Sequence, residues 1–117
     1  MNKGLEFYKQ FIDGLVKQRE CIEAKWVIGS GYPSTKGNGK INMFLESMTD
    51  DERAIIAEML QKARVSGIHD TLAYMDQMAD LDGLTLNQQG ENYPVDAFES
   101  MHYDFICRCE GDAWPEE

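Results

Sequence analysis

His69, Asp76 and Asp80 are the side chains of this sequence whose spacing most suggests chemistry. Steps of seven and four residues place them on one face of a helix, away from the apolar residues of the same segment. Asp76 and Asp80 lie one turn apart, so their like charges disfavour the helix unless a positive group neutralises them. A divalent cation or the arginine of a partner protein would do so, and a hydrated acidic ridge is the third interpretation.

A second acidic pattern overlaps the first and has the outline of a calcium-binding loop. Asp80, Asp82 and Glu91 occupy the first, third and twelfth positions of the twelve-residue pattern. The fifth and sixth positions hold a leucine and a threonine, where the loop requires a ligand and a glycine. The Asp-Gly pair at 82–83 is instead typical of a helix end. The loop pattern therefore fails, but the carboxylates themselves are suitable cation ligands. A divalent-cation-binding domain that uses Asp76, Asp80 and Asp82 is the alternative function.

The cysteines and histidines do not indicate a catalytic or metal site. Cys107 and Cys109 would point about 160° apart on a helix, so they could not share a metal ion with His102. His102 lies in an apolar stripe, which predicts a hydrogen-bonded core residue. Signatures of nucleophilic hydrolases, zinc proteases and dinucleotide binding are missing, and the glycine-rich segment 29–40 lacks the Gly-Lys-Ser/Thr of a phosphate loop. The sequence thus predicts no catalytic residues and no cofactor, and a small enzyme that acts through His69 or Cys107 is the third possibility, after an interaction protein and a cation-binding domain.

Negative charge is confined to the second half of the chain. Residues 1–64 contain ten Lys and Arg against nine Asp and Glu, whereas residues 65–117 contain Arg108 alone against twelve Asp and Glu. Such a half would repel nucleic-acid phosphates and attract a basic protein surface. We therefore expect a protein–protein interaction module that presents an acidic surface to a basic partner. A purely solubilising role of the charge is the competing interpretation.

Aromatic residues stand among these acidic residues. Complementary charge accelerates association, and buried aromatic side chains commonly supply much of the affinity of an interface. The predicted contacts with the partner are six carboxylates and one tryptophan: Asp76, Asp80, Asp82, Glu91, Glu99, Asp104 and Trp114. Trp114 belongs to a polar tail at 111–117, and it either folds back onto the core or stays exposed as an anchor.

Apolar residues recur at three- and four-residue steps over most of the chain, which predicts amphipathic helices. We expect an all-α fold, a single domain over 1–117 that forms a compact bundle. The four principal helices and one short helical segment are expected at 3–27, 50–66, 68–82, 96–110 and 41–48. Thr49 and Glu52 form a capping box, and Gly67 would end the helix that it starts. Asp96 would cap the last helix and Gly111 would end it.

The sequence favours a cytoplasmic protein. Charged residues occupy the amino terminus where a signal peptide would need an apolar core. Apolar runs are too short to span a membrane, so no membrane partner is expected. Three cysteines, an odd number, argue against a disulfide framework and for a reducing compartment.

Four short segments carry a resemblance to other proteins. The stretches 67–72 and 104–106, followed by Gly111-Asp112 and Trp114-Pro115, resemble segments of a small acidic bacterial family that is uncharacterised. In size, acidity and helical make-up the chain is also similar to bacterial immunity proteins, which neutralise a toxin by binding it. The second similarity implies a toxin as the basic partner, and neither similarity assigns a role to any residue.

Overall fold

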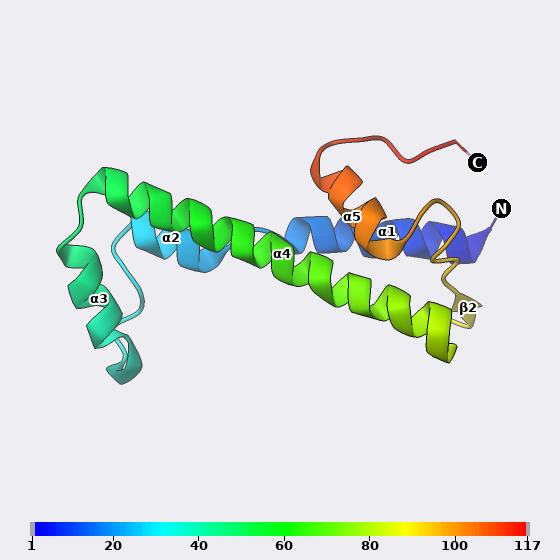
Figure 1. The fold of residues 1–117 in the computed structure, drawn as a ribbon, viewed down its shortest axis with the longest axis horizontal. Coiled ribbons are helices and arrows are strands. Elements are labelled where there is room, and N and C mark those ends of the chain that lie inside the picture. Colours follow the sequence, from blue (N-terminus) through cyan, green and yellow to red (C-terminus); the bar gives the residue numbers. More distant parts are fainter. Residues whose placement is uncertain (1, 117) are drawn as a thin grey trace. The chain divides into compact units, whose positions relative to one another are not determined.

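The computed structural model describes residues 2–116, and helices make up most of them (Figure 1). Their bounds, in chain order, are α1 Lys3–Gln18, α2 Ile22–Ile28, the 3-10 turn η1 Lys36–Asn38, α3 Gly39–Glu46, α4 Asp50–Asp82 and α5 Met101–Cys109. Two short strands, β1 Asn87–Gln88 and β2 Glu91–Asn92, pair antiparallel. The mainly helical class expected from the sequence is confirmed. Within residues 2–116, no helix is both long and apolar enough to cross a membrane.

The chain divides into two compact units. Met1–Arg19 and Ser66–Glu117 form the first unit, and Glu20–Val65 forms the second. The chain passes from one unit to the other twice, and the second boundary, between Val65 and Ser66, lies within helix α4. The single domain expected over 1–117 stays a prediction.

The first unit is built around α1, which packs against α5 and β2. Leu5, Tyr8 and Ile12 are buried on one face of α1 because they recur at three- and four-residue steps. Met101 and Phe105 on α5 are buried completely. Each side chain of this size contributes about 1.5–3 kcal/mol when it is fully buried. This core holds α5 in place, and α5 together with the segments before and after it carries the candidate site.

Helix α1 and strand β2 approach each other at Gly4. A Cβ atom at this position would lie 2.4 Å from the carbonyl oxygen of Asn92, which is too close for any side chain. The hairpin itself turns at Gln89 and Gly90, which both have positive φ angles. Glycine at position 4 therefore allows the strand to reach the first turn of the helix.

The second unit has a smaller core. It consists of Cys21, Ala24 and Val27 with Leu45 of α3 and Ala57 of α4. The predicted capping box starts α4: the Thr49 amide donates to Glu52 Oε1 at 2.9 Å, and the Glu52 amide donates to Thr49 Oγ1 at 3.2 Å. The short helical segment expected at 41–48 is α3, which begins two residues earlier and ends at Glu46.

The helix expected over 3–27 is two helices, because α1 ends at Gln18 and α2 begins at Ile22. Cys21 has an extended backbone, and its amide donates to Gln61 Oε1 of α4 at 3.1 Å. This contact spans 40 residues of sequence, so no local pattern could indicate it. The Cys21 side chain at this break is buried.

The expected helices 50–66 and 68–82 are one helix, α4, and Gly67 lies inside it. Glycine costs about 1 kcal/mol relative to alanine inside a helix, which is too little to stop one that continues on both sides.

The last helix starts at Met101, not at 96, because Ser100 is its N-cap and accepts from the Tyr103 amide at 3.3 Å. At its other end, Gly111 has a positive φ and terminates α5 as predicted.

Candidate functional site

The seven residues predicted to contact a partner differ sharply in burial. Asp76 and Asp104 are buried, with 8% and 4% of their surface exposed. Glu91 and Trp114 are half-buried. The exposed members are Asp80, Asp82 and Glu99. The acidic set is therefore not one continuous surface, because two of its carboxylates point into the first unit.

Asp76 joins α4 to the start of α5. Its Oδ1 accepts from the Met101 amide at 3.0 Å, and its Oδ2 accepts from the His102 amide at 3.0 Å. The Nδ1 atom of His102 also lies 2.6 Å from that oxygen. Because both oxygens are engaged, the expectation that Asp76 lies on an exposed ridge with His69 and Asp80 is wrong. Its side chain shares the buried side of α4 with Leu72, four residues before it.

The two histidines lie together near this junction. The rings of His69 and His102 are perpendicular, with centroids 5.2 Å apart. His69 Nδ1 also lies 3.1 Å from Asp70 Oδ1. His102 is hydrogen-bonded, as the sequence predicted, and its partner is Asp76, which the sequence did not indicate. Each imidazole is about one-third exposed, so His102 is not a fully buried core residue.

Asp104 is held by Tyr8 from the opposite helix. The Tyr8 hydroxyl donates to Asp104 Oδ2 at 2.5 Å inside the α1–α5 core. Burial raises the pKa of Asp104, while the hydrogen bonds from Tyr8 and from the amides of Glu99 and Ser100 act in the opposite direction. Burial, followed by the Asp104 hydrogen bond, also raises the pKa of Tyr8, so the phenol keeps its proton.

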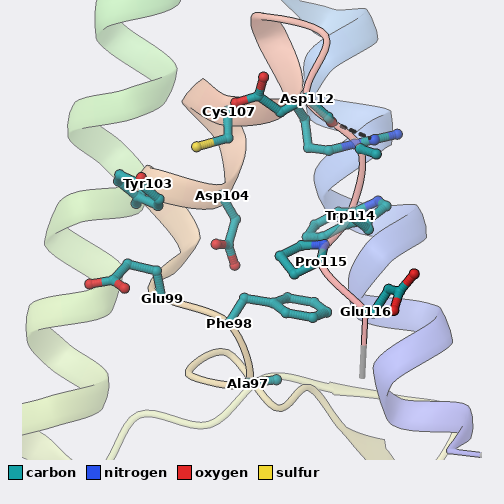
Figure 2. Close-up of a pocket in the computed structure, with 12 residues that line it drawn as sticks. Ala97, Phe98, Glu99, Tyr103, Asp104, Cys107, Asp112, Trp114, Pro115 and Glu116 are labelled. Carbon is teal, nitrogen blue, oxygen red and sulfur yellow. Dashed lines mark hydrogen bonds between the residues drawn. The ribbon is translucent and has the colours of Figure 1, made fainter.

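A cavity of about 420 Å³ opens between α5 and the segments that flank it (Figure 2). Three of the predicted residues, Glu99, Asp104 and Trp114, meet in its lining. Phe98 and Pro115 add apolar surface, and the remaining lining residues are Ala97, Tyr103, Cys107, Arg108, Asp112, Ala113 and Glu116. Figure 2 shows Asp104 between Tyr103 on one side and Trp114 with Pro115 on the other.

The tail after α5 folds back onto α1, which settles the two alternatives for Trp114. Its indole N–H donates to Asp13 Oδ2 at 3.1 Å. The same carboxylate accepts from Nε and Nη2 of Arg108 at 2.7 and 3.2 Å. The Arg108 guanidinium lies 5.1 Å from the centroid of the indole ring. Sequence reasoning missed Asp13 and Arg108, although Arg108 is a single basic residue in an acidic half.

The cavity lining is acidic on balance. Among its described residues, four carboxylate side chains stand against one basic group: Glu99, Asp104, Asp112 and Glu116 against Arg108. The Asp13 carboxylate already pairs with that guanidinium. The cavity lining therefore combines net negative charge with aromatic surface, and Lys9 Nζ lies beside it, 5.7 Å from the Phe98 centroid.

The other predicted residues lie elsewhere. Asp80 lines a smaller cavity of about 170 Å³ with Asp96, and Glu91 lies beside Lys3 and Glu6 of α1. Asp82 is exposed at the end of α4. Within residues 2–116, no group of three histidine, cysteine or acidic side chains is arranged to hold a metal ion.

The geometry defines a small acidic helical protein with an aromatic-lined cavity at its last helix. The chain belongs to the family of unknown function DUF6547, whose model matches residues 1–116 and so spans both units. The uncharacterised family expected from the sequence is confirmed. No curated protein and no solved structure matches the chain.

Proposed function

We propose that this protein is a cytoplasmic interaction module whose first unit docks on the basic surface of another protein, as an immunity protein docks on its toxin. The observation that carries the proposal is the acidic, aromatic-lined cavity beside α5. The charge of the first unit supports it, because this unit contains five Lys and Arg against fourteen Asp and Glu.

The exposed carboxylates provide the electrostatic attraction between this protein and its partner. Asp80, Asp82 and Glu99 are open to solvent, so they attract a basic surface through water and accelerate encounter. Exposed ion pairs each add only about 0.2–1 kcal/mol, so charge alone gives weak binding. Aromatic side chains in a cavity add the apolar contact from which most interface affinity comes.

The test compares two triple variants that lose the same charge. The first neutralises exposed carboxylates of the first unit: Asp80→Asn, Asp82→Asn and Glu99→Gln. The second neutralises exposed carboxylates of the second unit: Glu20→Gln, Glu46→Gln and Glu58→Gln. Tagged wild-type protein and both variants are used to capture partners from the native cell at low and at high salt. The captured protein is then purified and its Kd is measured against all three.

We expect a basic partner that binds the wild type and the second variant, and binds the first variant roughly tenfold more weakly or worse. Its Kd should rise with salt, because salt screens the exposed charges. Equal weakening in both variants would contradict the proposal, and so would a Kd that does not change with salt.

A further inference from the structure

The tail after α5 is anchored on α1 by one side chain. Trp114 is half-buried, whereas the tail residues on either side of it are exposed. Its indole N–H donates to Asp13 Oδ2 at 3.1 Å, and the Arg108 guanidinium lies 5.1 Å from its ring centroid. The rings of Phe98 and Tyr8 lie 5.2 and 6.0 Å from it, centroid to centroid, and Figure 2 shows Phe98 below the indole. The first unit therefore contains a complete site for a tryptophan side chain, and the tail of the same chain fills it.

The backbone of the tail makes its contacts where it leaves α5. The Asp112 amide donates to the Cys107 carbonyl oxygen at 3.0 Å, and Nη1 of Arg108 donates to the Asp112 carbonyl oxygen at 2.8 Å. In the described part of the tail beyond Asp112, the hydrogen bond to the rest of the unit is the one from the indole of Trp114. A segment with exposed residues and few buried contacts opens locally at a lower free energy than the unit unfolds. Release of this indole would therefore free the tail while α1 and α5 stay packed.

The charge of the tail does not match the charge of the unit that it covers. The tail contains three carboxylate side chains, those of Asp112, Glu116 and Glu117, and no basic residue. The first unit contains fourteen Asp and Glu against five Lys and Arg, and it stays acidic when the three residues of the tail are left out. Like charges repel, so a segment that presents tryptophan among basic residues is attracted to this site more strongly than the tail is.

We infer that the tail is an autoinhibitory latch, which a segment of the basic partner displaces by placing its own tryptophan in the site of Trp114. The inference rests on the proposed function for the existence of that partner, and it adds the side chain that the partner must present. Trp114 and Pro115 form part of the lining of the cavity beside α5, so the tail lies on the proposed docking surface. Tryptophan combines a large apolar face with an N–H donor, which this site binds with the rings of Tyr8 and Phe98 and the carboxylate of Asp13. Tryptophan is also a residue that commonly supplies a large share of interface affinity.

The experiment adds unlabelled synthetic peptides to the ¹⁵N-labelled full-length protein. The first peptide, Lys-Ala-Trp-Pro-Lys-Lys, has the tail's Ala-Trp-Pro among basic residues, and the second has alanine in place of tryptophan. The indole N–H signal of Trp114 is followed by NMR, and Trp26→Phe assigns the second indole signal. We expect the first peptide to move the Trp114 signal saturably to the position of a solvent-exposed indole, and the alanine peptide to leave it in place. The tail's own sequence, Asp-Ala-Trp-Pro-Glu-Glu, should bind about tenfold more weakly than the basic peptide, because three charges are reversed.

Variants of the full-length chain test the latch and the site separately. The latch lowers the apparent affinity of a competing segment in proportion to the fraction of molecules whose site is empty. Trp114→Ala empties the site, so it should bind the basic tryptophan peptide about tenfold more tightly than the wild type does. In that variant, Asp13→Asn should weaken the peptide about tenfold, because it removes the charged acceptor of the indole. Glu6→Gln removes the same charge from an exposed position of α1 and should change the affinity less than about twofold.

Two results would overturn the inference. One is an alanine peptide that moves the Trp114 signal as far as the tryptophan peptide does, and the other is a Trp114→Ala variant that binds no more tightly than the wild type. The NMR experiment uses the wild type, so it decides the inference even where Trp114→Ala destabilises the unit.

The two proposals fail in different ways. Suppose that the native partner binds with a salt-dependent Kd, but that Trp114→Ala leaves this Kd unchanged and the basic peptide does not release the indole. The acidic surface would then dock the partner with the tail in place, so only the inference would be wrong. If the peptide releases the indole but no basic partner distinguishes the triple variants, the latch exists and the proposed docking function is wrong.

Discussion

The carboxyl group of Asp104 is buried between α1 and α5, where little water can stabilise its charge. Burial is the largest influence on this group and raises its pKa above the ordinary value of 3.8. The folded chain therefore binds this proton more tightly than the unfolded chain does. Below pH 3.8 the group contributes its full stabilisation, and that contribution is lost as the pH rises through the folded pKa.

The variant Asp104→Asn tests this pH dependence, because asparagine has no charge at any pH and its side-chain oxygen can still accept from Tyr8. We expect the free energy of unfolding of the wild type, minus that of the variant, to fall as the pH rises above 3.8. The slope is at most about 1.4 kcal/mol per pH unit, and the difference levels off above the folded pKa. Urea denaturation at a series of pH values measures it.

An exposed aspartate provides the control for this measurement. Asp80→Asn removes the same charge from the surface of α4, where the side chain is exposed, so it should change the free energy of unfolding by less than about 0.5 kcal/mol. A difference for Asp104→Asn that rises with pH would show that hydrogen bonding, not burial, controls the carboxyl.

At the scale of the elements, Asp76 is the link between α4 and the beginning of α5. Asp76→Ala would leave the amides of Met101 and His102 without their acceptor, along with the imidazole of His102. We expect a loss of about 3 kcal/mol in the free energy of unfolding, and about half of that for Asp76→Asn, which keeps one acceptor oxygen. Asp80→Ala, one turn further along α4, should change it by less than about 0.5 kcal/mol. Equal losses at the two positions would contradict this role of Asp76.

Local signals in the sequence were sufficient where the contacts are local. The capping box at Thr49 and Glu52 joins residues three apart, and Gly111 ends α5 through its own backbone conformation. The break after α1 could not be predicted in the same way, because the Cys21 amide donates to Gln61 on another helix. The cap of α5 was misplaced at Asp96, since the choice between it and Ser100 depends on how the preceding loop packs.

The candidate site likewise contains residues that the sequence could indicate and contacts between distant residues that it could not. Its acidic and aromatic members Glu99, Asp104 and Trp114 were predictable from charge and composition. The pairing of Asp13 with Arg108 joins residues 95 positions apart, so no spacing rule could find it. The burial of Asp76 was missed because a helical wheel shows which residues share a face, but not how far the buried side of the helix extends.

At the scale of the whole molecule, the two units differ in how much apolar surface they bury. In the described chain, the largest fully buried side chains of the first unit are Tyr8, Ile12, Leu72, Met101 and Phe105, whereas the second unit contributes Val27. The second unit also leaves large apolar side chains exposed on α2, α3 and its part of α4, including Ile28, Met43 and Met59. Regions with few buried contacts open locally at a lower free energy than the global unfolding.

We therefore expect native-state hydrogen exchange to report two levels of protection. Amides of α2 and α3 should exchange through a low-energy opening of the second unit, while amides of α1 and α5 exchange only at a free energy near that of global unfolding. Val27→Ala should accelerate exchange in the second unit alone. Ile12→Ala should lower the protection of α1 and α5 by about 2–5 kcal/mol, because it leaves a cavity in the larger core. Equal protection of all four helices in the wild type, or a Val27→Ala effect that reaches α5, would instead show that the two units unfold as one.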